Sequence, residues 1–348
     1  MIWIAVSLLS IILISNIVGF VISAPGYNGE KTDHFDGKTF KNLGGIKAKG
    51  FKDVLTWSFN RDQGEWKKIE SLAVYPEIQN RLNDGEWKVT FVNHSTFLLQ
   101  IGEMNILTDP IWSERTSPVQ FAGPQRFVPP GIKFEGLPPI DVVIISHNHY
   151  DHLDVSTVKR LEKEHSPQFY TPLGVSQFLI DLGIKISHDM DWWEETGISD
   201  SIGLVCVPAQ HFSGRGTFDR DKTLWAGFVI KTNSGKIYFA GDTGYGEFFK
   251  TIGDRLGPFE LSMIPIGAYK PSWFMSPIHI SPQEAVKVHQ DVRSKKSISM
   301  HFGTFPLADD GIDDPTNDLK KGLKMYGVSE EDFLVLGNGE QYAVTFSN

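Results

Sequence analysis

The sequence predicts a layered α/β domain in which two β-sheets are covered on their outer faces by helices. Three observations predict it: short β-rich segments separated by turn residues from residue 87 onward, a strongly apolar segment at 141–146, and helical segments between the later strands. The chain has 348 residues, of which 41% are hydrophobic and 22% charged. It is therefore long enough for one such domain with additions, and its composition is typical of a packed globular protein.

The predicted elements follow one another along residues 87–348. Short β-rich segments at 88–92, 96–101 and 105–108 predict a meander. The apolar segment at 141–146 is typical of a strand buried on both faces. Helices are expected at 155–163 and 175–182, and a third helix near Pro282 with Ser281 as its N-cap. Further strands are expected at 202–207, 224–231, 236–240, 261–264 and 297–300.

Residues 1–23 form an apolar segment that predicts a membrane anchor or a signal segment. No charged side chain precedes Glu30, and a helix of this length would span about 30 Å, the thickness of a bilayer core. A cleaved signal normally has Lys or Arg near its start, but this segment has none, and Pro25 directly follows the candidate cleavage site at Ala24. The pattern favours an uncleaved anchor. We expect a membrane-associated protein, and the side of the membrane is not indicated.

Residues 24–86 are predicted to be a linker and an N-terminal extension that precede the main domain at 87–348. Residues 24–50 are rich in Gly, Lys and Asp, which is typical of an arm on the surface. Residues 51–86 carry several aromatic side chains, namely Phe51, Trp57, Phe59 and Trp66. These aromatics predict an ordered extension that packs onto the main domain.

Charge and cysteine content exclude some classes of function. The formal net charge is −9, so a nucleic-acid partner, which would need a basic face, is not expected. Cys206 is the only cysteine, so an intramolecular disulfide cannot form. Its apolar neighbours predict a small buried side chain.

The strongest chemical signal is a histidine-rich segment directly after the apolar strand at 141–146. It reads His147-Asn148-His149-Tyr150-Asp151-His152. In a loop at a strand end, alternate side chains can point into one pocket, so the first two histidines can share one ion and the last two residues can reach a second. Neutral imidazole and carboxylate suit zinc. A histidine-rich surface loop is the alternative, but four candidate ligands within six residues at a strand end favour a metal site.

Three later side chains occur in the same local context. His211, Asp242 and His301 each follow a predicted strand. Taken alone, each would more often be a structural residue than a ligand. Because strand ends converge on one edge of a sheet, where function is usually found, the three together with the first segment predict one shared metal site.

These motifs resemble the metallo-β-lactamase superfamily and, within it, the family of N-acylphosphatidylethanolamine-hydrolysing phospholipase D. The resemblance covers most of residues 87–310 and rests on the segments 107–111, 122–124, 146–153, 191–195, 239–245, 264–269, 273–275 and 301–305. It implies the metallo-β-lactamase αββα sandwich, with two mixed sheets flanked by helices, and it implies that residues 87–348 are the catalytic domain.

The resemblance also implies roles for individual residues. It assigns His147, His149 and His211 to one zinc, Asp151, His152 and His301 to a second, and Asp242 as a bridge between them that orients the attacking water. His279 is implied as a catalytic and substrate-binding residue, and Tyr150 as a substrate-binding residue. We also expect Asp109 to orient a ligand imidazole without binding metal itself. Since His and Asp also bind iron and manganese, the ligand types do not by themselves select zinc.

The implied function is a zinc-dependent phosphodiesterase of phospholipase D type. It would hydrolyse N-acylphosphatidylethanolamine to N-acylethanolamine and phosphatidic acid by attack of a hydroxide that bridges two metals. A phospholipid substrate agrees with the apolar N-terminal segment, and the resemblance implies a homodimer. We expect Trp192 and Trp193 in the core, whereas Trp273, Phe274 and Met275 are candidates for an acyl-chain groove.

Beside a nucleic-acid phosphodiesterase of this superfamily, which the net charge and the apolar N-terminal segment disfavour, two alternatives remain open at the sequence level. One is a lactonase or another hydrolase of the same fold, because the metal ligands do not distinguish attack on carbon from attack on phosphorus. The other is a non-catalytic, membrane-tethered lipid-binding protein. Metal analysis and assays with phosphodiester and lactone substrates would separate them.

Overall fold

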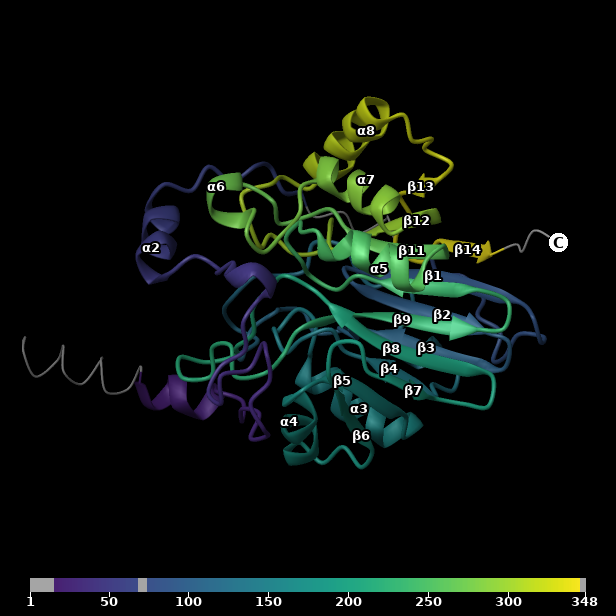
Figure 1. Cartoon of the computed structure of the whole chain (residues 1–348), viewed down its shortest axis with the longest axis horizontal. Coiled ribbons are helices and arrows are strands. Elements are labelled where there is room, and N and C mark those ends of the chain that lie inside the picture. The colour runs from purple at the N-terminus through teal and green to yellow at the C-terminus, as the bar shows by residue number, and fades with distance from the viewer. Residues whose placement is uncertain (1–15, 68–73, 345–348) are drawn as a thin grey trace, which may run out of the picture.

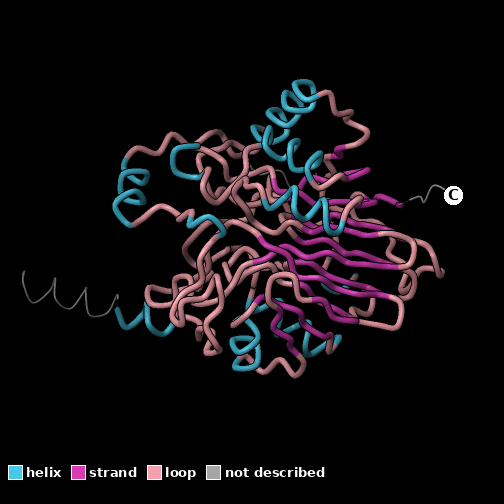
Figure 2. Tube along the Cα trace, viewed as in Figure 1, coloured by secondary structure: helices cyan, strands magenta, loops and turns pink. Residues whose placement is uncertain are grey.

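The computed structural model describes residues 16–67 and 74–344, and within them two seven-stranded sheets pack face to face with helices outside (Figures 1 and 2). The strand orders are β14-β1-β2-β3-β4-β5-β6 and β13-β12-β11-β10-β9-β8-β7. Both sheets mix parallel and antiparallel pairs. This confirms the predicted αββα sandwich.

The first sheet begins with the predicted meander. Strands β1 to β3 are antiparallel neighbours, and β3 to β6 then run parallel. The C-terminal strand β14 pairs with β1, and Val344 of β14 lies opposite Trp87 of β1. Its strands are β1 (Trp87–Asn93), β2 (Thr96–Ile101), β3 (Met104–Thr108), β4 (Val142–Ile144), β5 (Gln168–Pro172), β6 (Ser187–Met190) and β14 (Gln341–Val344).

The second sheet is antiparallel from β7 to β10 and parallel from β10 to β13. Strands β8, β9, β10, β11 and β12 correspond to the segments predicted from 202 onward. The strands are β7 (Glu195–Gly197), β8 (Ile202–Pro208), β9 (Ala226–Thr232), β10 (Lys236–Phe239), β11 (Phe259–Pro265), β12 (Ser294–Met300) and β13 (Phe333–Leu334).

Helices cover the outer faces. α3 (Val155–His165) and α4 (Val175–Asp181) bury apolar side chains against the first sheet. α5 (Phe248–Leu256) and α7 (Pro282–Asp291) lie on the second sheet, with α8 (Asp314–Tyr326) packed on α7. The predicted cap of α7 is confirmed, since Ser281 and Glu284 form a reciprocal capping box. Shorter helices are η1 (Leu43–Gly45), α2 (Phe51–Phe59), η2 (Phe134–Gly136) and α6 (Ser272–Met275).

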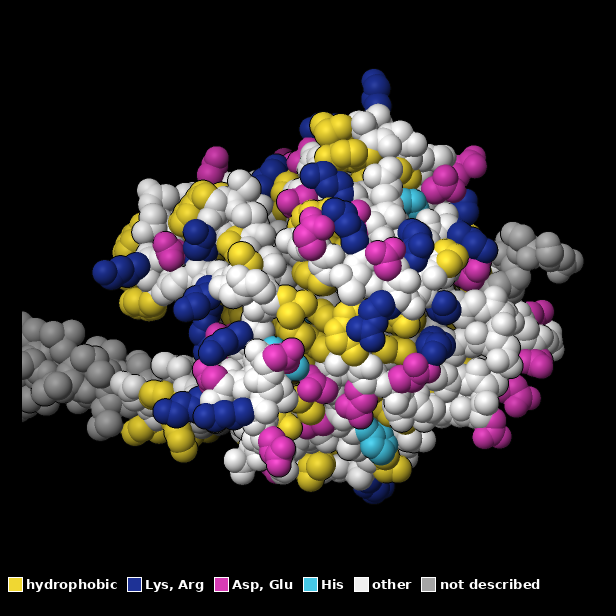
Figure 3. Space-filling view, in the orientation of Figure 1, with side chains coloured by type: hydrophobic (Ala, Val, Ile, Leu, Met, Phe, Trp, Pro, Cys, Tyr) yellow, Lys and Arg dark blue, Asp and Glu magenta, His cyan; other side chains and the backbone are white. Residues whose placement is uncertain are grey.

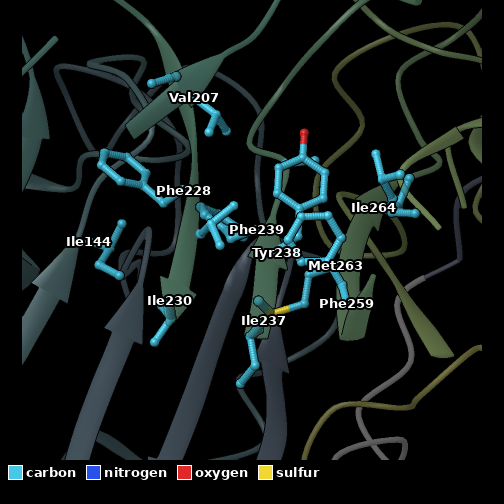
Figure 4. Close-up of a cluster of buried hydrophobic side chains, with 14 of the residues drawn as sticks. Ile144, Val207, Phe228, Ile230, Ile237, Tyr238, Phe239, Phe259, Met263 and Ile264 are labelled. Atoms are coloured by element: carbon cyan, nitrogen blue, oxygen red, sulfur yellow. The ribbon is translucent and has the colours of Figure 1, made fainter. Parts of the chain in front are cut away.

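The main core lies between the two sheets. Figure 4 shows side chains of β4, β8, β9, β10 and β11 in this cluster, among them Ile144, Phe228 and Phe239, all fully buried. Burial of each such side chain stabilises the fold by about 1.5–3 kcal/mol, which makes the sandwich a rigid support for the loops at its edge. Cys206 and Trp192 are buried in this core, as expected.

The N-terminal arm packs closely onto the domain. Phe35 and Phe40 are buried and contact each other at 4.5 Å, and the His34 ring stacks on Trp192 at 4.6 Å. Residues 24–42 are therefore bound along the domain surface, as an arm rather than a free linker.

The prediction for the aromatics of the extension is partly wrong. Trp57 stacks on Phe274 at 5.0 Å, and Trp66 contacts Phe127, so these two pack on the domain. Phe51 and Phe59 are 75% and 85% exposed. The reason is helical geometry: positions 51 and 59 lie on the face of α2 that points away from Trp57.

The predicted membrane anchor is only partly within the described residues. Residues 16–22 are helical, and residues 1–15 lie outside the described part. No helix among the described residues combines the length and apolar composition needed to cross a bilayer. The anchor therefore stays a prediction.

Candidate metal centre

All seven candidate ligands lie at one edge of the sandwich, at the C-terminal ends of strands. The 147–152 loop follows β4, and single residues follow β8, β10 and β12. These side chains are buried except at His149 and Asp151, which are half-buried. The structure therefore brings together every residue that the sequence predicted for the metal site.

The first group consists of His147, His149 and His211, whose ring nitrogens lie within 4.8 Å of one another. His147 Nε2 is 2.8 Å from His149 Nδ1, which is 3.3 Å from His211 Nε2. The other nitrogens of two of these rings face protein oxygens, because His147 Nδ1 is 2.9 Å from Ser146 Oγ and His211 Nδ1 is 2.9 Å from the Ile278 carbonyl. The inward nitrogens are therefore free to act as electron-pair donors.

The second group centres on the Asp242 carboxylate. Its Oδ2 atom is 3.1 Å from His152 Nε2, 3.0 Å from His301 Nε2 and 3.8 Å from His211 Nε2. Asp151 Oδ2 is 3.2 Å from His152 Nε2 and 3.3 Å from His301 Nε2. Asp242 is thus the side chain that contacts both groups, the position predicted for the bridge.

Protonation in the first group fits a cation. Burial lowers the pKa of His149 to about 4, and burial also holds the pKa values of His147 and His211 well below the ordinary value. All three imidazoles are therefore neutral at neutral pH, which is the form of histidine that binds a divalent metal. The donor set therefore fits such a metal.

Protonation in the second group supports the same conclusion. Burial alone lowers the pKa of His301, but the Asp242 charge and the hydrogen bond with Asp151 outweigh it and raise the pKa to about 9. The pKa of His152 is also raised, by Asp242, Asp151 and Asp109, against the effect of burial. Without metal, protons on these imidazoles balance the carboxylates. The buried Asp242 Oδ1 has no hydrogen-bond partner among the described residues.

Asp109 lies beneath the loop, where it was expected to orient a ligand. Its Oδ2 atom accepts hydrogen bonds from His152 Nδ1 and Ser146 Oγ, each at 2.6 Å, and its Oδ1 accepts from the Ser146 backbone at 2.7 Å. Asp109 has φ 34°, and the candidate ligand His301 has φ 60°. Such conformations cost energy and persist only where the surroundings enforce them, which is typical of functional sites.

The sequence did not identify His94, which lies in the short turn between β1 and β2. Its ring Nε2 is 3.0 Å from Asp151 Oδ2, and its carbonyl accepts the His301 backbone N–H at 2.7 Å. The imidazole is fully buried, and burial lowers its pKa to about 3. A hairpin turn is ordinarily exposed, so the only available signal was a histidine between two apolar strands.

Asn42 is the second residue that the sequence did not identify. From the N-terminal arm, its Oδ1 accepts hydrogen bonds from the His211 backbone N–H at 2.9 Å and from Trp225 Nε1 at 2.8 Å. Its Nδ2 donates to the His211 carbonyl at 2.8 Å and to the Ile46 carbonyl at 3.1 Å. The arm therefore holds the backbone of a candidate ligand from both sides.

The two predicted substrate contacts differ in position. His279 Nδ1 is 3.9 Å from Asp242 Oδ2, has no hydrogen-bond partner among the described residues, and lines the cavity beside the site. Tyr150 donates its hydroxyl to the Arg215 carbonyl at 3.0 Å, is covered by the Arg215 guanidinium and does not line this cavity. The structure therefore brings His279 to the metal cluster, while the role of Tyr150 stays a prediction.

A cavity of about 290 Å³ opens beside the cluster. Its lining includes His149, Asp151 and Asp242 of the cluster. Its walls are largely apolar and include Val54, Trp57, Phe274, Met275, Ile278 and Leu307. Of the proposed groove residues, Phe274 and Met275 line this cavity, whereas Trp273 does not and is 46% exposed.

The chain matches a family model over the region that carries the site. Residues 104–302 match the beta-lactamase superfamily domain. A metallo hydrolase of Ignicoccus hospitalis, Igni18, superposes with a TM-score of 0.59 over 75% of this chain and all of the other, at 21% identity, which supports the fold. Fold and site together define a metal-dependent hydrolase of the metallo-β-lactamase superfamily.

Relatives at higher identity place the chain within that superfamily. It is 42% identical over 286 residues to N-acyl-phosphatidylethanolamine-hydrolyzing phospholipase D 1 of Caenorhabditis elegans, which covers 78% of this chain and 80% of the relative. It is 32% identical over 223 residues to the mitochondrial enzyme of the same name in Saccharomyces cerevisiae, which covers 62% of this chain and 47% of the relative. The chain belongs to this phospholipase D family.

Proposed function

We propose that this chain is a zinc-dependent phosphodiesterase that hydrolyses N-acylphosphatidylethanolamine to N-acylethanolamine and phosphatidic acid. The observation that carries the proposal is the convergence of seven His and Asp side chains, with Asp242 between the other six. The 42% identity to a nematode enzyme named for this substrate supports the choice of substrate.

The residues would divide the chemistry as follows. His147, His149 and His211 would hold one zinc, Asp151, His152 and His301 would hold a second, and Asp242 would contact both. Zinc held by these residues would supply positive charge and would lower the pKa of a bound water towards neutrality, so that a nucleophile would exist at working pH.

Two further side chains would act on the proton and on the substrate. Asp242 Oδ1, which has no hydrogen-bond partner among the described residues, can accept the proton of the attacking water and orient it. Burial lowers the pKa of His279 to about 4, so its neutral ring can serve as a hydrogen-bond partner of a phosphate group that enters the cavity.

The shape of the cavity supports a lipid substrate. Trp57, Phe274 and Met275 present apolar surface directly beside the polar cluster. A phospholipid has the same arrangement, with a charged phosphate next to acyl chains. We propose on this basis that the enzyme works at a membrane, together with the anchor predicted at residues 1–23.

The test joins metal analysis to hydrolysis of an N-acylphosphatidylethanolamine. We expect about two metal ions per chain, release of N-acylethanolamine, and loss of activity after chelation. His149→Ala and Asp242→Ala should lose activity by about a thousandfold or more while they stay folded, because both side chains lie on the sandwich edge and not in its core. His188→Ala, an exposed histidine on β6, is the matched control.

Two results would overturn the proposal. One is full hydrolysis by Asp242→Ala protein in metal-free buffer. The other is hydrolysis of lactones without hydrolysis of the phospholipid, which would keep the metal site and replace the substrate.

A further inference from the structure

Exposed apolar side chains are concentrated near the N-terminus of the described chain. Among the described residues, nineteen large hydrophobic side chains are exposed, and nine of them lie between residues 17 and 59. These nine are Ile17, Val18, Phe20, Val21, Leu43, Ile46, Phe51, Leu55 and Phe59. Scattered exposed apolar residues are normal, but a concentration of this kind marks an interaction surface.

Helix α2 carries the most exposed part of this surface. Phe51, Leu55 and Phe59 recur every four residues, so they lie on one face of the helix, and they are 75%, 41% and 85% exposed. The opposite face is fixed to the domain, because Trp57 stacks on Phe274 and donates its indole N–H to Asp309 at 3.1 Å. The helix is therefore held in place with its apolar face outward.

The charges around this face are basic, although the whole chain has a net charge of −9. Residues 43–59 contain Lys47, Lys49 and Lys52 against the single acidic residue Asp53, a net charge of +2. Asp53 is already engaged, since its carboxylate accepts the Gly50 N–H at 3.0 Å at the helix start. In Figure 3, apolar and basic side chains gather on the side of the molecule where Figure 1 places α2 and residues 16–22.

The same segment forms a wall of the cavity beside the metal cluster. Ala48, Lys49, Val54 and Trp57 line that cavity together with His149 and other residues of the cluster. One face of α2 therefore lines the cavity, while the other is apolar, exposed and bordered by lysines. A partner bound to the outer face would lie next to the cavity opening.

We propose that residues 43–59 form a docking surface for a phospholipid bilayer that contains anionic lipid. Phe51, Leu55 and Phe59 insert among the lipid chains, the exposed Lys47 and Lys52 contact anionic headgroups, and the cavity opens towards the bilayer. A helix with an apolar face and a basic border is typical of elements that lie in the membrane interface. A second copy of the chain is the less favourable occupant, because a twofold contact through this surface would bring like lysines together.

The orientation of the cavity rests on the proposed function, but binding does not require hydrolysis. The first experiment therefore uses vesicles without substrate. Cys206 is the only cysteine and is fully buried, so a new surface cysteine can be labelled selectively. Leu55→Cys in the full chain would carry an environment-sensitive fluorophore, and Met325→Cys, on α8 at a position 67% exposed, would carry the same label as the control.

With vesicles of phosphatidylcholine and phosphatidylserine, we expect the emission of the label at position 55 to shift to shorter wavelength and to rise. The label at position 325 should not change, and the response at 55 should weaken with phosphatidylcholine alone. Because the label reports on α2 itself, binding through residues 1–23 cannot produce the signal. The proposal is overturned if vesicle-bound protein shows no change at position 55. It is also overturned if raising the protein concentration without vesicles produces the same change.

A second experiment separates docking from catalysis. The double variant Phe51→Ser and Phe59→Ser should lower vesicle partitioning and hydrolysis of vesicle-borne substrate by about tenfold or more, because two large apolar side chains no longer enter the lipid. Hydrolysis of a dispersed short-chain N-acyl phospholipid should stay within about twofold of wild type, and Met325→Ser should match wild type throughout. Equal losses on both forms of substrate would contradict docking. Vesicle binding by a chain that hydrolyses no N-acyl phospholipid would refute the proposed function alone.

Discussion

The arm residue Asn42 allows a quantitative prediction about how the metal centre is supported. Asn42→Ala removes four hydrogen bonds and leaves the backbone N–H and C=O of His211 without the Asn42 partners. Trp225 keeps one acceptor, the Ala209 carbonyl at 3.1 Å. Each buried backbone group left unsatisfied costs about 1–3 kcal/mol, so for the two groups of His211 we expect a loss of about 2–6 kcal/mol in the free energy of unfolding.

The assay is urea unfolding of metal-free protein, with hydrogen exchange at the His211 amide and metal titration against a competing chelator. Metal affinity should fall by about tenfold or more, because the His211 backbone is no longer fixed. Asn60→Ala is the control, since Asn60 is exposed and its side chain, among the residues that the structure describes, donates only to the Thr56 carbonyl at 2.7 Å. A change below about 0.5 kcal/mol in Asn42→Ala, together with unchanged metal affinity, would refute this account.

Three further predictions concern histidines. His94→Ala should lower the affinity for one of two bound metals by about 10–100-fold, because Asp151 loses a buried partner. Equal metal affinities of the variant and the wild type in the chelator titration would contradict this. Metal binding should release protons, and metal affinity should rise as pH rises towards 9, because His301 has a pKa of about 9 and must lose its proton before it can bind the metal. Calorimetry in two buffers of different ionisation enthalpy measures the proton release, and the absence of any release would refute this prediction. The pKa of His34 is raised, because its hydrogen bonds with Asp191 and Asp33 outweigh the effect of burial. The protonated His34 therefore stabilises the folded state fully at pH values below its ordinary pKa of 6.5, and this stabilisation is lost as pH rises through the raised pKa. Unfolding free energies of wild type and His34→Gln should converge at high pH, and a constant difference would contradict this.

Much of the fold could be predicted because its signals are local. The strands of the meander, the buried β4 and the cap of α7 each follow from apolar pattern or turn chemistry within a few residues. The predicted metal ligands also share one local signal, a polar side chain shortly after a strand, and strand ends meet at one sheet edge.

The residues that the sequence did not identify depend on contacts between distant segments. Asn42 acts on the His211 backbone from 169 positions away, and His94 reaches Asp151 across 57 positions. Asn42 follows no predicted strand, and His94, although it follows the strand predicted at 88–92, stands in a short hairpin turn, so no local pattern separates either residue from an ordinary arm or turn residue. The sequence did not predict the exposure of Phe51 and Phe59 for a related reason. Aromatic side chains are buried on average, but packing against the rest of the domain decides which face of a helix is buried.

The spread of the cluster along the chain has a consequence for how the protein is made. Its first predicted ligand is His147 and its last is His301, and the side chains between them come from both sheets. A nascent chain on the ribosome therefore presents only the 147–152 loop and His211 until Asp242 and then His301 emerge. The complete cluster of candidate ligands forms only when both sheets have closed on each other, so we expect metal uptake to be a late step of biogenesis.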